Sequence, residues 1–437
     1  MATTLTVNHQ PSTVNHSLKH DPYSAFRIAD FRRYIFAWVT SQIGFEIQSV
    51  AIAWEVYERT GSARAIGITG GVQALPVILL ALPAGQMADM FDRRKLVFVS
   101  RLLAAACSIG LALSSYYQAP INWMYCLLLM ASISGTIGRP AQSSLMPQLV
   151  PAEIFSNAAT WSSSTWQFAG VVGPALGGLV LIYSIQAAYV IAAAGSIYFA
   201  VSVLTLNPQE TDRKKEPVTM KTLLAGCRFV WDKRVLFTII SLDLFAVLLG
   251  GATYLLPIFA KDILHVGGIG FGLLRAAPAV GAFAMAIGIA HLPPFRKAGV
   301  AMLWAVAGFG VATIVFGISR SFTLSLVMLF LAGALDNVSV VVRHTLIQLL
   351  TPDEMRGRVS AVNSVFISSS NQIGGLESGE TAEWWGPVTA VVVGGVGTIV
   401  VVIVTAVLSP QLLKIGSLEE VHKEEGPVEE EEEDCEL

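Results

Sequence analysis

The sequence predicts an all-α membrane protein with twelve transmembrane helices arranged as two pseudo-symmetric six-helix bundles. Three observations support this fold class: the composition, the apolar runs and an internal repeat. Of the 437 residues, 54% are hydrophobic and 14% are charged, and the mean hydropathy is +0.61. A soluble domain carries about 25% charged residues. The composition therefore excludes an ordinary water-soluble protein.

Twelve apolar runs divide the chain, and each is close to the roughly 20 residues that a helix needs to cross a bilayer. The first six runs cover residues 34–57, 65–88, 96–117, 121–146, 157–183 and 186–206. The second six cover residues 235–260, 267–291, 299–318, 321–349, 358–379 and 386–408. Backbone polar groups in hydrocarbon must be satisfied within the protein, so we expect every run to be a helix.

The polar segments complete the domain organisation. We expect a cytoplasmic N-terminal tail over 1–30, a first bundle over 31–206 and a second bundle over 235–408. The linker 207–234 carries apolar residues at helical spacing, which predicts a short amphipathic helix on the cytoplasmic surface. The segment 409–437 is a cytoplasmic tail rich in consecutive acids, which cannot form a packed core and predict disorder.

The basic residues predict the orientation of the helices in the membrane. Of the 28 Lys and Arg residues, 20 fall in segments on one side, 4 in loops on the other side and 4 within the runs. Lys and Arg are enriched on the cytoplasmic side of membrane proteins. We therefore expect both termini to be cytoplasmic.

A repeat relates the two halves of the chain. Five residues, Pro151, Glu153, Ser163, Gly173 and Gly178, recur 201 positions later as Pro352, Glu354, Ser364, Gly374 and Gly379. Six helices return the chain to the same side of the membrane, so the repeat keeps its orientation. Parallel repeats of this kind place a binding site near the membrane midplane, between the two halves.

Several classes of function are not expected. The four cysteines show no paired spacing, so we expect neither disulfides nor a metal site. No glycine-rich phosphate-binding loop occurs in the sequence, which argues against ATP-driven transport. We expect no enzymatic activity, no cofactor and no nucleic-acid partner, and we expect a monomer.

Charged residues inside the apolar runs are candidates for substrate binding and proton coupling, because a charge in hydrocarbon is costly to bury. Glu46 lies near the middle of run one, and Gln42, Glu46 and Ser49 share one helix face. Asp336 lies near the middle of run ten, with Arg343 two turns away on the same face. We expect Glu46 and Asp336 to be the acidic pair that recognises a proton or another cation.

Four further charges complete this set: Arg275, at a depth similar to that of Glu46, and Asp243, Arg139 and Glu377. Arg275 or Arg343 could compete with a proton for one of the two carboxylates, so that protonation frees a helix to move. The alternative is that these charges form structural ion pairs. For Asp243 and Arg139 that alternative stays open.

Two motifs are candidates for conformational gating. In the segment Gly85–Lys95, the residues Gly85, Asp89, Arg93 and Arg94 resemble the loop between helices two and three in the major facilitator superfamily, while Met90 and Asp92 depart from that pattern. In run five, Gly173 and Pro174 belong to a glycine-rich stretch that resembles the fifth-helix motif of facilitator antiporters. We expect the loop to join the two halves on the cytoplasmic side, with Asp89 near the start of run eleven.

Six segments carry a more specific resemblance: Gln48–Ala51, Thr60–Ser62, Gly85–Lys95, Ser241–Phe245, Gly272–Pro278 and Thr351–Arg358. Through them, residues 25–410 resemble the enterobactin-exporter branch of this superfamily, which also includes drug-efflux proteins. It implies the major facilitator fold and secondary active transport by alternating access. It further implies proton-coupled efflux of an amphiphilic small molecule, drug-like or siderophore-like, across the bacterial inner membrane. The implied partners are this substrate, protons or another coupling cation, and the lipid bilayer.

Two alternatives to drug or siderophore efflux stay open. Related facilitators move lysophospholipids, so one alternative is a lipid flippase of the same fold, which would need an apolar lateral portal. The other is a facilitator-like membrane sensor or scaffold that binds a partner through its acidic tail. The charges near the midplane argue against a scaffold, which does not need them.

Overall fold

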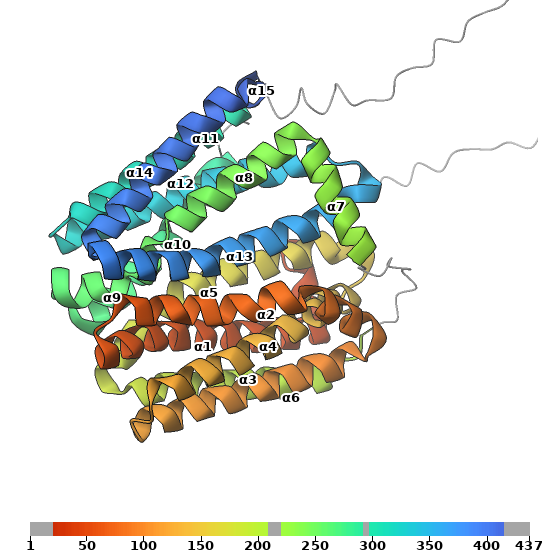
Figure 1. Ribbon diagram of the computed structural model, residues 1–437. Coiled ribbons are helices and arrows are strands. Elements are labelled where there is room, and N and C mark those ends of the chain that lie inside the picture. Colours follow the sequence, from red (N-terminus) through yellow and green to blue (C-terminus); the bar gives the residue numbers. More distant parts are fainter. Residues whose placement is uncertain (1–20, 209–219, 292–296, 415–437) are drawn as a thin grey trace, which may run out of the picture.

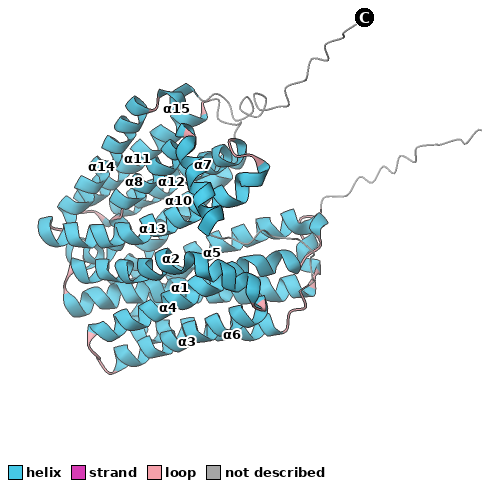
Figure 2. Cartoon of the chain, turned by 45° about the vertical axis from the view of Figure 1, so that its right-hand side comes forward, coloured by secondary structure: helices cyan, strands magenta, loops and turns pink. Residues whose placement is uncertain are grey.

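The structure is a computed structural model, and it describes residues 21–208, 220–291 and 297–414. The expected N-terminal tail is therefore described only from residue 21. Disorder was expected over 409–437, but Pro410–Lys414 form a short helix, and residues 415–437 lie outside the described residues. Within the described ranges the chain is helical and contains no β-strand (Figure 2).

Six long helices form the first half of the bundle. They are α1 (Ala29–Thr60), α2 (Ala63–Met90), α3 (Arg93–Tyr116), α4 (Ile121–Leu145), α5 (Phe155–Tyr183) and α6 (Ile185–Leu204). α3 packs against α4 and α6, and α1 packs against α5 and α6. Gly61 ends α1 in the left-handed conformation, with φ of 61°. Ser62 then caps α2, because its hydroxyl accepts the Ala65 N–H at 3.3 Å.

The second half contains six further long helices. They are α8 (Arg234–Leu249), α10 (Gly267–His291), α11 (Ala298–Ile318), α12 (Phe322–Leu349), α13 (Asp353–Trp385) and α14 (Pro387–Leu408). α12 packs against α10 and α11, while α8 packs against α13 and α14. The other elements are η1 (Ser24–Arg27), η2 (Met146–Gln148), η3 (Ala152–Ile154), α7 (Met220–Asp232), η4 (Ala252–Tyr254), α9 (Leu256–Ile258), η5 (Phe259–Ile263) and α15 (Pro410–Lys414). α7 is the short helix expected before the second half.

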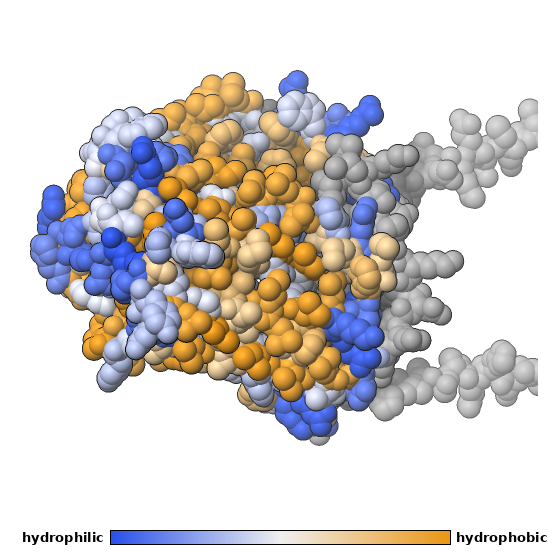
Figure 3. Space-filling view, turned by 60° about the horizontal axis from the view of Figure 1, so that its bottom comes forward, coloured by the Kyte–Doolittle hydropathy of each residue, from blue (hydrophilic) through white to orange (hydrophobic). Residues whose placement is uncertain are grey.

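Ten segments of the described chain are long and apolar enough to cross a membrane. α1 and α13, of 32 and 33 residues, run alongside them but are too polar to be among the ten. The expected number of twelve spans therefore depends on counting these two helices. Figure 3 shows an apolar surface with hydrophilic side chains gathered toward its two ends, as a protein that spans a bilayer requires. The chain is a multi-pass membrane protein.

The run expected as one helix over 235–260 is broken. α8 ends at Leu249, and after the turn η4 the chain resumes helical structure as α9 and the π-helical η5. Gly250 and Gly251 explain the end of α8, because glycine favours leaving a helix. Pro257 then lies in the first turn of α9, where its missing N–H costs nothing.

The segment Gly85–Lys95 is mostly helical, contrary to the expected loop. Only two residues separate α2 from α3. One of them, Asp92, caps α3 by accepting the Arg94 N–H at 2.9 Å, which accounts for an acid at this position. The side chain of Asp89 lies outside the described part of the structure.

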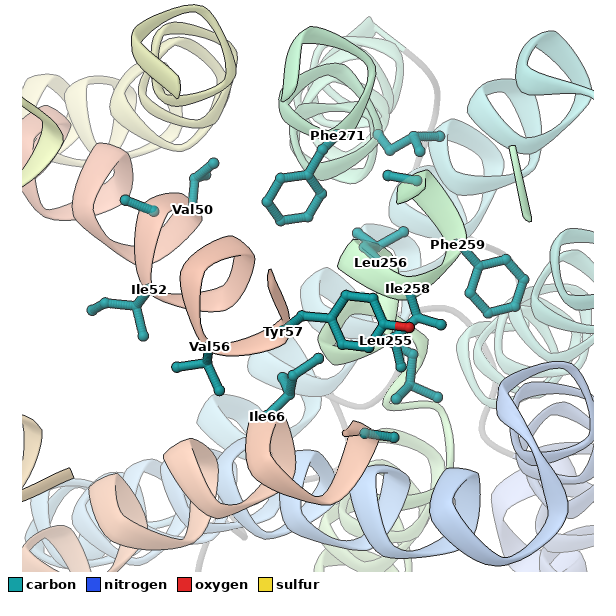
Figure 4. Close-up of a cluster of buried hydrophobic side chains, with 14 of the residues drawn as sticks. Val50, Ile52, Val56, Tyr57, Ile66, Leu255, Leu256, Ile258, Phe259 and Phe271 are labelled. Carbon is teal, nitrogen blue, oxygen red and sulfur yellow. The ribbon is translucent and has the colours of Figure 1, made fainter. Parts of the chain in front are cut away.

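The two ends of the bundle differ in how the halves meet. The terminal end carries η1, α7 and α15, and the loop end carries the turns from α1 to α2, from α5 to α6 and from α13 to α14 (Figure 1). A buried core at the loop end draws on both halves and includes Val56, Ile66, Leu256, Phe259 and Phe271 (Figure 4). Among the described residues, each of the other three buried clusters belongs to one half only.

Glycine pairs bring the backbones of the two halves together at the loop end. A methyl group at Gly272 of α10 would lie 2.7 Å from Cα of Gly178 of α5. One at Gly379 of α13 would lie 2.6 Å from Cα of Gly67 of α2. Gly178 and Gly379 are equivalent positions of the repeat. The α5–α10 and α2–α13 contacts therefore follow the pseudo-symmetry of the chain, and small residues allow both.

Candidate functional site

A cavity of about 270 Å³ lies between the halves, beside the core of the loop end. α1, α2 and α4 line it from one half, and η4, α10 and α13 from the other. Its polar lining comes from Glu46, Gln48, Ser49, Thr69, Gln73, Ser132, Arg139, Tyr254, Arg275 and Gln372. Ile52 and Ile66 belong both to its apolar lining and to the buried core (Figure 4). The cavity therefore offers charge, hydrogen bonds and apolar surface to one ligand.

Glu46 reaches the cavity from α1 at a point where α5 supplies a glycine. A methyl group at Gly173 would overlap with Cβ of Glu46, so this contact requires glycine. The backbone oxygen of the adjacent Pro174 faces α10, where a methyl group at Gly272 would lie 2.7 Å from it. Gln42 donates an Nε2–H hydrogen bond to Glu46 Oε1 at 3.3 Å. The glycine-rich stretch of α5 thus packs against both α1 and α10.

Arg275 of α10 extends across the boundary between the halves. Its guanidinium donates to Ser49 Oγ of α1 at 3.3 Å and to the backbone oxygen of Thr253 at 3.3 Å. That oxygen is available because Thr253 lies in η4, where the helix is broken. The next residue, Tyr254, donates to Gln372 Oε1 of α13 at 3.0 Å. The break therefore supplies a backbone acceptor for Arg275.

Arg139 lines the same cavity from α4, and its side chain is exposed to that space. Ser132 of the same helix donates to the backbone oxygen of Gln73 at 2.9 Å and so joins α4 to α2. Across the described residues, neither Glu46 nor Arg139 has an ion-pair partner within 4.0 Å. One acidic and two basic side chains, including Arg275, therefore line the cavity.

Arg343 was expected to compete with a proton for the carboxylate of Asp336, but it pairs with Asp243 of α8 instead. The guanidinium contacts the Asp243 carboxylate, and the two side chains are 3% and 9% exposed. A guanidinium is costly to bury, and a carboxylate in contact with it offsets part of that cost. The packing of α8 against α12 supplies it, and the helix face of α12 alone could not reveal that partner. Asp336 does not line the cavity that Glu46 lines, so the two acids do not meet as a pair there.

The other predicted residues lie away from the cavity. Glu377 of α13 accepts a hydrogen bond from the hydroxyl of the next residue at 3.4 Å. Arg94 donates to the backbone oxygen of Leu206 at 2.9 Å and so joins α3 to the end of α6. Gly85 lies inside α2, and Arg93 is the first residue of α3.

Polar contacts across the halves at the loop end were not predicted. They pair Tyr57 with Asp262, Ser62 with Glu383 at 2.9 Å, and Arg64 with Glu380 at 3.0 Å. We call these three pairs the loop-end clasp. The partners are 205 to 321 positions apart, so no local pattern indicates them. The sequence showed only that polar residues occur around the turn from α1 to α2, toward the end of α13 and in η5.

A second unpredicted network lies within the first half. Glu55 is buried, pairs with Arg59 at 3.3 Å and accepts a hydrogen bond from Tyr189 OH of α6 at 2.7 Å. The spacing of Glu55 and Arg59 by four residues was the signal for their pairing. This network holds α1 to α6.

Comparison with known proteins agrees with this architecture. Residues 20–432 match the family described as transmembrane secretion effector. Enterobactin exporter EntS of Citrobacter koseri is 26% identical over 93% of this chain and 96% of its own length. EntS of Shigella boydii serotype 18 is 25% identical over 90% of this chain and 94% of its own length.

Two solved structures show the same fold. The nucleoside transporter NupG has a TM-score of 0.68 at 14% identity, with 87% of this chain and 99% of that chain covered. An inward-facing, occupied bacterial homologue of the human lysosomal transporter Spinster has a TM-score of 0.68 at 15% identity, with 90% and 97% covered. The chain therefore belongs to the transmembrane secretion effector family of major facilitator transporters, in the branch that holds the enterobactin exporters.

Proposed function

We propose that this protein is a secondary active transporter that moves an amphiphilic small molecule by alternating access. The observation that carries the proposal is the cavity lined by both halves, next to a core that joins them at the loop end. A carrier of this kind opens its central site to one side at a time. The separate cores of the two halves elsewhere support a state that is closed at the loop end.

The cavity supports a substrate that combines an apolar body with acidic or oxygen-rich groups. Arg139 and Arg275 offer guanidinium groups, which bind anionic and planar oxygen-bearing groups well. Ile52, Ile66 and Leu128 offer apolar surface beside them. The relatives are named for the export of enterobactin. We therefore infer efflux of a siderophore-like or drug-like molecule.

Coupling to protons, or to another cation, is assigned to Glu46. Its carboxylate reaches the cavity with a hydrogen bond from Gln42 and no fixed ion pair among the described residues. A carboxylate without a permanent positive partner is free to exchange a proton with the cavity. Arg275 lies on the facing half, so a change of charge on Glu46 alters the attraction between the halves. Asp336 is the second candidate, whereas Asp243 is bound to Arg343.

Transport into proteoliposomes under an imposed pH gradient tests the proposal, with catecholate siderophores and amphiphilic dyes as probes. We expect Glu46→Gln to exchange probe downhill but not to accumulate it against a gradient, while Glu58→Gln, at an exposed acid of the same helix outside the cavity, keeps accumulation. Accumulation with normal pH dependence in Glu46→Gln would remove this residue from coupling. Movement of lysophospholipid in place of these probes would favour the flippase. Absence of any transport would favour the sensor or scaffold.

We place the protein in the bacterial inner membrane because its relatives are bacterial exporters. We place both termini in the cytoplasm because of the distribution of Lys and Arg. The variants Glu58→Cys and Thr323→Cys should then react with an impermeant thiol reagent in intact cells. Lys297→Cys should react only in opened cells. Labelling of Lys297→Cys in intact cells would reverse the orientation.

The cytoplasmic gate is assigned to the region where α2 meets α3. Arg94 already joins α3 to the end of α6, so this region is anchored within the first half. We infer that Asp89 and Arg93 engage the second half when the carrier faces outward. Asp89→Asn should then shift the population toward the state open at the terminal end, measured as the distance between spin labels at Lys95 and Lys297. Unchanged populations would remove the gate from this region.

A further inference from the structure

A groove of about 520 Å³ lies between α8 and α14, which run side by side in the second half (Figure 1). Both helices belong to candidate membrane spans. The groove shares no lining residue with the central cavity. Its walls are mainly apolar and include Phe237, Leu242, Phe245, Val400, Val404 and Leu408. It is therefore a separate site on the second half.

The length of the groove matches one leaflet of a bilayer. Along α8 the lining extends from Arg234 to Phe245, which corresponds to about 16 Å at a rise of about 1.5 Å per residue. The hydrocarbon core of a bilayer is about 30 Å thick. An occupant that fills the groove therefore extends from the membrane surface to near the midplane.

The polarity of the groove changes along this length. Trp231 and Arg234 line its mouth at the terminal end, and Phe245 and Val400 line its deep end. Trp231 is 71% exposed, which is typical of tryptophan at a membrane interface. Near the mouth, the hydroxyls of Thr238 and Ser409 form a hydrogen bond at 2.9 Å, which ties α8 to the end of α14.

The mouth of the groove is positively charged. Arg234 lines it, and Lys233 is exposed beside it. Neither side chain makes an ion pair within 4.0 Å in the described part of the chain. The nearby Asp232 lies 3.9 Å from Arg228, so those two charges offset each other. Two uncompensated bases thus lie at the mouth of an apolar groove.

We propose that this groove binds an anionic glycerophospholipid from the surrounding bilayer. One acyl chain lies between α8 and α14, and the phosphate lies at Arg234 and Lys233. The bilayer supplies at high concentration a molecule with an apolar chain one leaflet long and an acidic head. Each base near a membrane surface favours an anionic lipid by a small, additive amount. This site is independent of the transported substrate.

Native mass spectrometry of the purified full-length protein tests the proposal. Phosphatidylglycerol and phosphatidylcholine with the same acyl chains are added in turn, and the bound lipid is counted. We expect the wild type to prefer phosphatidylglycerol. The double variant Lys233→Gln, Arg234→Gln should bind it about 30-fold more weakly, since each base contributes roughly a fivefold preference, with little change for phosphatidylcholine.

Lys297→Gln is the matched control, because Lys297 is an exposed base outside this groove. It should leave the preference intact. Ser241→Phe fills the groove and should weaken binding of both lipids alike. Equal binding of the two lipids by the wild type, or an equal loss in Lys297→Gln, would overturn the proposal.

Two competitors separate the phospholipid from other occupants. Excess inorganic phosphate should displace little phosphatidylglycerol, because the acyl chain contributes to binding. Complete displacement by phosphate would reduce the groove to an anion site and overturn the proposal. Displacement by a peptide of residues 415–437 would assign the groove to the acidic tail and would likewise overturn it.

Discussion

The loop end and the terminal end of this bundle are held together by different means. At the loop end, one core, two glycine pairs and the loop-end clasp join the halves. Toward the terminal end, α2 and α13 diverge (Figure 1), and the buried clusters of the described residues stay within one half. The contacts between the halves are therefore concentrated at one end.

This difference indicates which parts of the molecule move together. Each half is tied internally by its cores and by buried polar contacts between helices, such as the Asp243–Arg343 ion pair and the hydrogen bond from Tyr189 to Glu55. Such densely packed interiors resist deformation. The contacts between the halves at the loop end combine one shared core with backbone contacts at glycines and a few polar pairs. We therefore expect the halves to move as rigid bodies.

The largest expected effect comes from breaking the ion pair within the second half. Asp243→Asn leaves the Arg343 guanidinium buried without a carboxylate, which costs about 3–5 kcal/mol. We expect a lower temperature of unfolding in detergent and poor expression. The double variant Asp243→Asn, Arg343→Gln should recover most of the loss.

Asp262→Asn is the matched control for that prediction, because Asp262 belongs to the loop-end clasp rather than to the interior of one half. It should leave the temperature of unfolding almost unchanged. Wild-type stability of Asp243→Asn would show that the halves are not held internally as we describe.

A smaller effect is expected from adding a methyl group where α5 and α10 touch across the two halves. Gly272→Ala brings a methyl group to 2.7 Å from Gly178 Cα, which disfavours the closed loop end. Forced overpacking costs about 1–3 kcal/mol. Spin labels at Glu58 and Thr323 should therefore show longer distances, and transport should fall about tenfold.

Gly288→Ala is the control on the same helix, because a methyl group there meets nothing within 4 Å. It should leave the distances and transport as in the wild type. The same loss of transport in both variants would mean that helix propensity, rather than contact between the halves, controls the rate.

A related pair of substitutions tests whether Gly173 positions Glu46 for coupling to the proton gradient. Gly173→Ala places a methyl group where Cβ of Glu46 lies, whereas Gly170→Ala places one 3.9 Å from Ala279 Cβ, an ordinary contact. We expect Gly173→Ala to lose most of the dependence of transport on the pH gradient and Gly170→Ala to keep it. Equal pH dependence in both variants would show that Gly173 does not position Glu46.

The positions of most helices could be predicted from the sequence, because a membrane span is apolar and the segments between spans are polar. Runs eight and ten end shortly before a proline, and run nine ends before Ser319 and Arg320. The helices α10, α11 and α12 match these runs closely. α13 extends well beyond the expected 358–379, because polar residues on a helix that faces other helices do not stop it. The break after Leu249 was readable from Gly250, Gly251 and Pro257, but hydropathy alone averages over it.

The candidate site was only partly predictable. The rise per residue predicted similar depths for Glu46 and Arg275, and both side chains line the same cavity. The partner of Arg343 was not predictable, since the rotation of α8 relative to α12 depends on packing between distant segments. The same limit explains why Gly173, expected in gating, could not be linked to Glu46 from the sequence.

The smallest expected effect comes from the exposed part of the loop-end clasp. Arg64 and Glu380 are 47% and 31% exposed, and exposed ion pairs contribute about 0.2–1 kcal/mol. Arg64→Ala should therefore shift the ratio of open to closed loop ends by about 1.4- to fivefold, measured with the labels at Glu58 and Thr323. Arg27→Ala is the matched control, because it removes an exposed ion pair with Asp21 at the terminal end, within one half. Added salt should reduce the difference between Arg64→Ala and wild type, since it screens exposed charges. A shift of equal size in Arg27→Ala would show that the two ends do not differ in how they join the halves.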